Sequence, residues 1–410
     1  MDIEIGHSTR FDGRRLEHMC RRLDAHYLQS GRLPHLQLAV WADGEKALDW
    51  VAGRANEAGD ALSADALYRI ASMTKPVTSV AFMMLVERGL VALDTPVQTV
   101  IPEFAGLEVV SAPDPSARSG PPLAARPMLM IDLMRHTAGF TYSFQECTAV
   151  DRLYAERQLD VFHQKRTPEE YIAAIAELPL LFSPGEGWNY SIATDILGLV
   201  VERVSGVTLE QFFADMIFTP LGMDDSFFVV PPDKLSRLTD AWQAGPDGTL
   251  SLYDRGANSR WRSRPSSYSG GGGLVSSCAD YGRFCAMLLN GGAVDDVRIL
   301  APKTIDLMTQ NHLPGGGDLA SVSTSLFSES TNSGVGFGLG VAVTMDPARA
   351  MMPGSAGEYY WGGLLSTAFF VDPVERIVAV LMTQAMPSSA FTIRREWKTM
   401  LYSALVESRT

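Results

Sequence analysis

Strand-forming segments lie at both ends of this 410-residue chain, whereas most helix-forming segments lie in its middle. Near the N-terminus, two such segments flank Asp43-Gly44, a dipeptide typical of a two-residue hairpin. Near the C-terminus, a second pair flanks Asp372-Pro373, and a helical stretch follows over about 390–406. The expected strands are residues 35–42, 46–52, 366–371 and 377–383. Because each strand has to bury an apolar face, this distribution predicts one antiparallel sheet built by both termini.

The middle of the chain favours helices, and one more helix is expected near the N-terminus, from Asp12 to Gly31. The helical segments of the middle are residues 72–89, 168–178, 193–205 and 209–218. The expected fold class is therefore α/β (α+β), an antiparallel sheet flanked by helices with an inserted, mainly helical domain. The expected division places residues 1–70 and 265–410 in a discontinuous sheet domain and 71–264 in the helical domain. Long loops are expected at 111–127 and 311–334.

Composition narrows the range of partners. The formal net charge is −13, which argues against nucleic acid and anionic membranes as partners. The N-terminal residues show no secretory signal and no stretch reaches the length of a membrane span, so we expect a cytoplasmic protein. The four cysteines form no CxxC pair and the seven histidines form no HExxH motif, so we expect reduced thiols and no metal site. The oligomeric state does not follow from the sequence.

A candidate nucleophile stands out in an S-x-x-K pattern formed by Ser72 and Lys75. A serine and a lysine three apart on a helix share a face, so a neutral lysine can accept the hydroxyl proton. A serine at a helix start also presents an N–H group that is free to bind an oxyanion. Taken alone, the pattern is equally compatible with a capping serine followed by a solvated lysine. The strongly apolar helix that follows Pro76 favours the first interpretation, because it would bury the surroundings of the pair.

Six motifs in a fixed order then give the chain a family resemblance. They are residues 68–76 (YRIASMTKP), 135–140 (RHTAGF), 184–191 (PGEGWNYS), 220–223 (PLGM), 269–274 (SGGGGL) and 361–363 (WGG). With these motifs the chain resembles the class C β-lactamase-like serine hydrolases, and within them most closely the family VIII carboxylesterases. The resemblance runs from about residue 36 to residue 382, nearly the whole chain.

The resemblance implies a set of roles. Ser72 would be the acylated nucleophile, and Lys75 with Tyr190 would form the general base. The oxyanion hole would consist of the backbone N–H groups of Ser72 and of Leu364. Leu364 follows residues 361–363 (WGG), which are the third catalytic motif of the family. Trp361 with Gly362 and Gly363 would line the substrate site. No cofactor is implied.

Two departures from the β-lactamase pattern bear on the substrate. Trp361 stands where β-lactamases carry a lysine, and Ile192 stands where they carry an asparagine that meets the substrate amide. Both changes favour a neutral ester, and we expect Ile192 to contact it. The bulky Leu364 and Leu365 leave the size of the acyl pocket open.

The predicted function is therefore hydrolysis of small, short-acyl carboxylic esters through an acyl-enzyme on Ser72, with a small-molecule ester as partner. The alternatives are a β-lactamase- or peptidase-type amide hydrolase, an acyltransferase, and a non-catalytic binding protein of the same fold. We interpret His136 as scaffolding, and residues 270–273, which lack the lysine of a P-loop, as a turn near the pocket.

Overall fold

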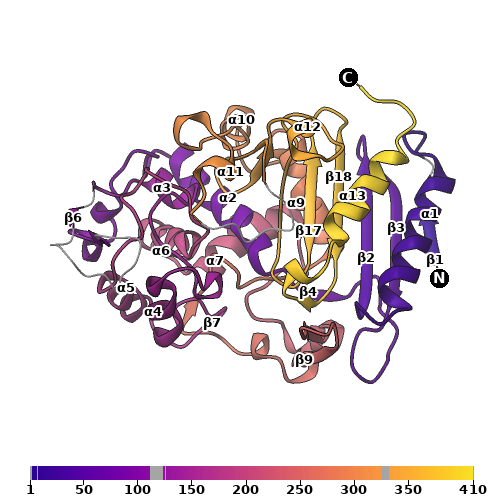
Figure 1. The fold of residues 1–410 in the computed structure, drawn as a ribbon, viewed down its shortest axis with the longest axis horizontal. Coiled ribbons are helices and arrows are strands. Elements are labelled where there is room, and N and C mark those ends of the chain that lie inside the picture. Colours follow the sequence, from indigo (N-terminus) through magenta and orange to yellow (C-terminus); the bar gives the residue numbers. More distant parts are fainter. Residues whose placement is uncertain (1, 7, 111–122, 125, 325–331, 410) are drawn as a thin grey trace.

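The computed structural model describes residues 2–6, 8–110, 123–124, 126–324 and 332–409. An eight-stranded antiparallel sheet dominates one half of the molecule, and helices dominate the other half (Figure 1). In spatial order the strands are β1, β3, β2, β18, β17, β16, β15 and β14. Their bounds are β1 Asp2–Ile5, β2 His35–Ala42, β3 Glu45–Gly53, β14 Val335–Phe337, β15 Ala342–Thr344, β16 Tyr359–Gly362, β17 Ala368–Asp372 and β18 Ile377–Met382. The prediction of an antiparallel sheet built by both termini is thus confirmed.

The N-terminal hairpin forms as its turn residues predict. Asp43 and Gly44 both adopt positive φ, 55° and 85°, which a two-residue type I′ turn requires. The two termini meet where β18 pairs with β2, placing Leu381 opposite Leu38. Strands β2 and β18 are almost wholly buried, since they lie at the centre of the sheet and are covered on both faces.

Helices cover both faces of the sheet. On one face lie α1 (Gly13–Leu23) and α13 (Ile393–Ser403), which contact each other. Asp12 caps α1 by accepting hydrogen bonds from the first backbone N–H groups of the helix. On the other face lies α9 (Cys278–Leu289), which packs against β18 (Figure 1).

The remaining helices and small sheets lie mainly in the other half. The helices are α2 Thr74–Glu87, α3 Met130–Met134, α4 Ala149–Arg157, α5 Pro168–Ala176, α6 Ala193–Ser205, α7 Leu209–Phe213, α8 Thr219–Leu221, α10 Pro302–Met308, α11 Leu319–Val322 and α12 Pro347–Ala350. Four small sheets have two strands each: β4 Leu67–Arg69 with β11 Val275–Ser277, β5 Glu108–Val109 with β6 Leu123–Ala124, β7 His163–Gln164 with β10 Ser267–Tyr268, and β12 Ala293–Val294 with β13 Val297–Arg298. A fifth has three strands in the order β19 Ala385–Met386, β8 Ala241–Ala244 and β9 Leu250–Asp254.

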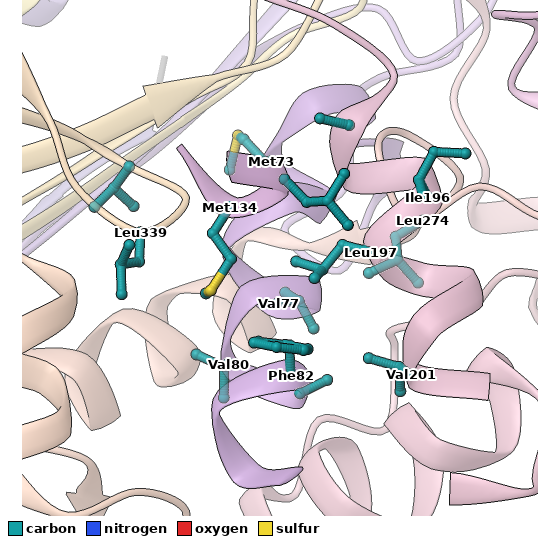
Figure 2. Packing of buried hydrophobic residues seen from close by; sticks show 14 of the residues in the cluster. Met73, Val77, Val80, Phe82, Met134, Ile196, Leu197, Val201, Leu274 and Leu339 are labelled. Atoms are coloured by element: carbon teal, nitrogen blue, oxygen red, sulfur yellow. The ribbon is translucent and has the colours of Figure 1, made fainter. Parts of the chain in front are cut away.

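Helix α2 forms the centre of the largest apolar cluster. Twelve of its residues are buried, and its side chains meet α6 on one side, as Figure 2 shows for Val77, Phe82, Leu197 and Val201. The same cluster extends to Val380 on the sheet. Packing is therefore continuous between the sheet and the helices, and the predicted domain boundaries at residues 71 and 264 stay a prediction.

The two segments expected to be long loops differ in how far the structure describes them. The segment 311–334 is not structureless, because it contains α11, whose N-cap Asp318 accepts a hydrogen bond from the Ser321 N–H. The segment 111–127 lies largely outside the described residues. No helix in the described part of the chain is long and apolar enough to cross a bilayer.

Replacing Phe82 by alanine tests the importance of this core. Its ring is fully buried between α2 and α6, so Phe82→Ala should lower the free energy of unfolding by about 3–5 kcal/mol, measured by urea denaturation. Leu90→Ala, just beyond the same helix and 57% exposed, is the control and should change it by less than about 0.5 kcal/mol. Equal effects of the two substitutions would contradict this account of the core.

Candidate active site

Ser72 lies at the junction between a strand and a buried helix. Strand β4 pairs with β11, and a 3₁₀ turn, Ala71–Met73, leads directly into α2. The predicted helix over 72–89 therefore begins two residues later, at Thr74. Ala71 has φ of 45°, a left-handed conformation that costs a non-glycine residue energy and gives the chain a sharp bend before Ser72. The Tyr281 hydroxyl donates to the Met73 carbonyl at 2.8 Å and supports the turn from below.

Lys75 lies in the first turn of α2 and is completely buried. Its Nζ donates three hydrogen bonds: to Ser72 Oγ at 3.4 Å, to the Tyr142 hydroxyl at 2.9 Å and to the Gly271 carbonyl at 2.7 Å. An ammonium group has three N–H donors and no acceptor. Each of the three donors of the Lys75 ammonium group therefore has one acceptor in the site.

Tyr142 is a site residue that sequence reasoning missed. Besides accepting from Lys75, its hydroxyl donates to Asp195 Oδ2 at 3.4 Å. Asp195 Oδ1 accepts from Ser269 Oγ at 2.5 Å and from the Gly271 N–H at 3.1 Å. Burial, together with the charge of Asp195, raises the pKa of Tyr142 well above its ordinary value. Tyr142 therefore keeps its proton and connects Lys75 with Asp195.

A weak signal for both missed residues exists in the sequence. Tyr142 follows the RHTAGF motif by two residues, and Asp195 is the one charged residue in the apolar run 192–201. Burial raises the pKa of Asp195, while the Lys75 ammonium opposes that rise. Sequence alone did not show that these two side chains meet, because 53 residues separate them.

Tyr190 joins the same cluster, although not by the hydrogen bond that its expected role implies. Lys75 Nζ lies 4.7 Å from the centre of the Tyr190 ring, a cation–π contact. The Tyr190 hydroxyl accepts instead from Trp361 Nε1 at 3.4 Å. Tyr190 thus has a cation against its ring and an N–H donor at its oxygen.

Residues 361–363 form the side of the site that the sheet contributes. They lie at the end of β16, and Gly363 comes so close to the chain before Ser72 that a Cβ there would clash with the Ile70 carbonyl. The Gly363 carbonyl accepts from Arg394 Nη2 at 2.5 Å. The third motif is therefore held against the nucleophile turn on one side and against α13 on the other.

The backbone hydrogen bonds of the turn after this motif do not use the Leu364 N–H group. They use the Gly363 N–H, which donates to the Thr367 carbonyl, and the Ser366 N–H, which donates back to the Gly363 carbonyl. The Leu364 N–H donates to no backbone carbonyl in the described part of the chain.

A cavity of about 380 Å³ opens beside these groups. Ser72, Tyr142, Tyr190, Trp361, Gly362, Gly363 and Leu364 all line it. Lys75 is completely buried and does not line the cavity, although it contacts Ser72, which does.

Ile192, in contrast, does not reach the cavity. It is fully buried in the core just before α6, so we do not retain it as a substrate contact. Of the two bulky residues after the motif, Leu364 lines the cavity, whereas Leu365 is buried elsewhere.

Two minor motifs also have definite positions. His136 is buried, its Nδ1 lies 3.2 Å from Ser191 Oγ, and its ring packs edge-on against Tyr190 with centroids 5.0 Å apart. Burial, and secondarily the charge of Lys75, lowers the pKa of His136 well below its ordinary value. Residues 270–273 form a turn as expected, but one that contributes a carbonyl directly to Lys75.

Comparison with known proteins places the chain in a family that agrees with the geometry of this site. The family model described as Beta-lactamase matches residues 20–402. Esterase EstB of Burkholderia gladioli is 32% identical over 89% of this chain and 90% of its own, and acyltransferase calJ of Penicillium decumbens is 29% identical over 82% and 81%. Among solved structures, EstCE1, described as a hydrolase with promiscuous acyltransferase activity, superposes with a TM-score of 0.79 at 23% identity, covering 95% of this chain and 99% of its own.

Removing the Tyr142 hydroxyl tests the missed residue. Tyr142→Phe deprives Lys75 of its 2.9 Å acceptor, so the rate at which a fluorophosphonate labels Ser72 should fall about 10- to 100-fold. Tyr171→Phe is the matched control, because this buried hydroxyl donates to the Leu159 carbonyl and does not touch Lys75. Labelling is followed by intact mass at several time points. Equal rates for the two variants would show that Tyr142 does not support Ser72.

Proposed function

Because the chain belongs to the β-lactamase family and is a serine hydrolase, we propose that it is a carboxylesterase that cleaves short-acyl esters through an acyl-enzyme on Ser72. The observation that carries the proposal is the contact between Ser72 and the buried ammonium of Lys75 at the wall of a cavity that Tyr190 also lines. The 32% identity with an esterase over nine-tenths of both chains supports the choice of ester. The motif order supports membership of family VIII.

In the first step, Ser72 Oγ attacks the ester carbonyl while its proton passes to a base. Lys75 is hydrogen-bonded as an ammonium, and the raised pKa of Tyr142 keeps the proton of that phenol in place. Tyr190 is therefore the base that we assign, acting as a phenolate beside the Lys75 charge and the Trp361 N–H. The proton then returns from Tyr190 to the departing alkoxide.

In the second step, water attacks the acyl-enzyme with Tyr190 again as base, releasing the acid and regenerating Ser72. Both tetrahedral intermediates carry an oxyanion, for which we assign the N–H groups of Ser72 and Leu364. Ser72 is the second residue of its turn, where N–H groups lack an intrahelical acceptor. The approach of Gly363 to Ile70 brings Leu364 to the same cavity wall.

The chemistry of the lining supports a small-molecule ester as the substrate. Trp361 carries no charge to attract the carboxylate of a β-lactam, and its N–H is already directed at Tyr190. The bulky Leu364 lines the same cavity as Ser72, which favours a short acyl group. We also propose a cytoplasmic location, which the four unpaired cysteines support.

Acyl transfer is a second candidate, favoured by the 29% identity with an acyltransferase over most of both chains. An alcohol that enters the cavity can attack the same acyl-enzyme in place of water. The cavity is large enough for a drug-sized molecule, so an acceptor has room beside a short acyl group.

Hydrolysis of p-nitrophenyl butyrate tests the main proposal. Ser72→Ala should lose at least about 1,000-fold in kcat, because no other hydroxyl replaces the nucleophile. Ser30→Ala is the control, because the Ser30 hydroxyl donates to the His26 carbonyl and does not line the cavity. This variant should retain the wild-type rate. Nitrocefin turned over faster than the ester would favour the lactamase alternative instead. If no acylating probe labelled Ser72, the result would favour the alternative of a non-catalytic binding protein.

Adding 1-butanol to the same assay tests acyl transfer. We expect butyl butyrate to accumulate beside butyric acid in proportion to the alcohol concentration, measured by gas chromatography. The ester should be absent with Ser72→Ala. Formation of butyric acid alone at every alcohol concentration would restrict the enzyme to hydrolysis.

A further inference from the structure

The cavity carries an excess of positive charge although the chain as a whole carries −13. Among the described residues, its charged lining consists of Arg260, Arg394, Arg395, Lys398 and Asp160. Four cations thus face one carboxylate. Such a reversal of sign concentrates an attractive field for anions inside the cavity.

Two of the cations serve the fold. Lys398 forms an ion pair with the fully buried Glu358. Arg394 donates to the carbonyls of Gly363 and Thr367 and so holds the third motif in place. Neither side chain is available to a ligand without loss of these contacts.

Arg260 is differently placed. It is exposed at the cavity wall, while both of its neighbours are buried. Ser259 Oγ donates to Asp254 Oδ2 at 2.6 Å, and Trp261 Nε1 donates to the Gly273 carbonyl at 2.8 Å. The backbone at Arg260 is therefore held rigidly, whereas its guanidinium has no hydrogen-bond or ion-pair partner within the described part of the chain.

Arg395 provides a second uncommitted guanidinium. It lies in the first turn of α13, near the buried Ile393 and Trp397, and its side chain has no polar partner among the residues that the structure describes. The segments that carry the two arginines follow β9 and β19, which belong to the same three-stranded sheet. Both side chains thus line one cavity from neighbouring parts of the fold.

We propose that Arg260, with Arg395, binds a carboxylate that the substrate carries away from its scissile ester. The proposal rests on the proposed esterase function and adds the substrate class, an ester with a free acid group. A guanidinium offers parallel N–H donors that match the two oxygens of a carboxylate. Because Trp361 is neutral, the third motif offers no cation to a carboxylate. Arg260 and Arg395 are the uncommitted cations of the described cavity lining that can bind one.

A matched pair of substrates, 4-acetoxybenzoate and its methyl ester, tests the proposal through release of the phenol. The two differ in one negative charge. The kcat/KM of the acid divided by that of the methyl ester therefore isolates recognition of the carboxylate. Wild type should favour the acid, and Arg260→Gln should lower the ratio about tenfold, as expected for loss of a hydrogen bond to a charged group. Arg395→Gln should lower it less, and the double variant most.

Arg262→Gln is the control for these variants. Arg262 is an exposed arginine two residues along the same segment, it donates to the Ala257 carbonyl, and it does not line the cavity. Its ratio should equal that of wild type. Added salt should reduce the preference of wild type for the acid, because screening weakens exposed charge pairs.

Binding to Ser72→Ala separates this proposal from the proposed function. The dissociation constant of 4-acetoxybenzoate, measured by calorimetry, should rise about tenfold when Arg260→Gln is added, and that of the methyl ester should not follow it. This result supports the carboxylate site even if no ester is hydrolysed. Unchanged kcat/KM ratios and dissociation constants in the double arginine variant would overturn it.

Discussion

The buried ammonium of Lys75 is the interaction on which the site depends. A charge with no exposure to water is costly unless hydrogen bonds and opposite charge compensate it. Here the Ser72 hydroxyl, the Tyr142 phenol and the Gly271 carbonyl each accept one hydrogen bond from the ammonium. Asp195 supplies the negative charge and is connected to Lys75 by the hydrogen bond from Tyr142. Removing any of these partners would leave part of the charge unsatisfied, so the stability of each contact depends on the others.

Close backbone contacts bring those partners to Lys75. The Gly271 carbonyl reaches it from the glycine-rich turn, whose N–H group also binds Asp195. Gly363 lies against the chain just before Ser72, where a side chain would not fit. These glycines are therefore structural requirements of the site. A Cβ at Gly271 would clash with the Asp195 carboxylate, and one at Gly363 would clash with the Ile70 carbonyl.

The two tyrosines differ in their roles because their surroundings differ. Tyr142 faces the carboxylate of Asp195, which favours the protonated phenol. Tyr190 has the Lys75 cation against its ring and the Trp361 N–H directed at its hydroxyl. The two phenols thus share one lysine but differ in their other partner, a carboxylate for Tyr142 and an N–H donor for Tyr190. Trp361 accordingly has a second role, as a hydrogen-bond donor to Tyr190.

The sequence by itself determined four neighbouring strands of the sheet (β2, β3, β17 and β18), its N-terminal hairpin, the helices of the middle of the chain up to residue 218 that it predicted, and the stretches that carry Ser72 and Trp361. It did not predict the outer strands β1, β14, β15 and β16 or helix α9. The features that it predicted follow from local periodicity, turn chemistry and the order of motifs, all of which are written along the chain. Only the tertiary structure decided that Tyr142 and Asp195 join the site and that Ile192 does not. Such contacts join residues far apart in sequence, and their geometry depends on how helices and sheet pack, which no local pattern encodes.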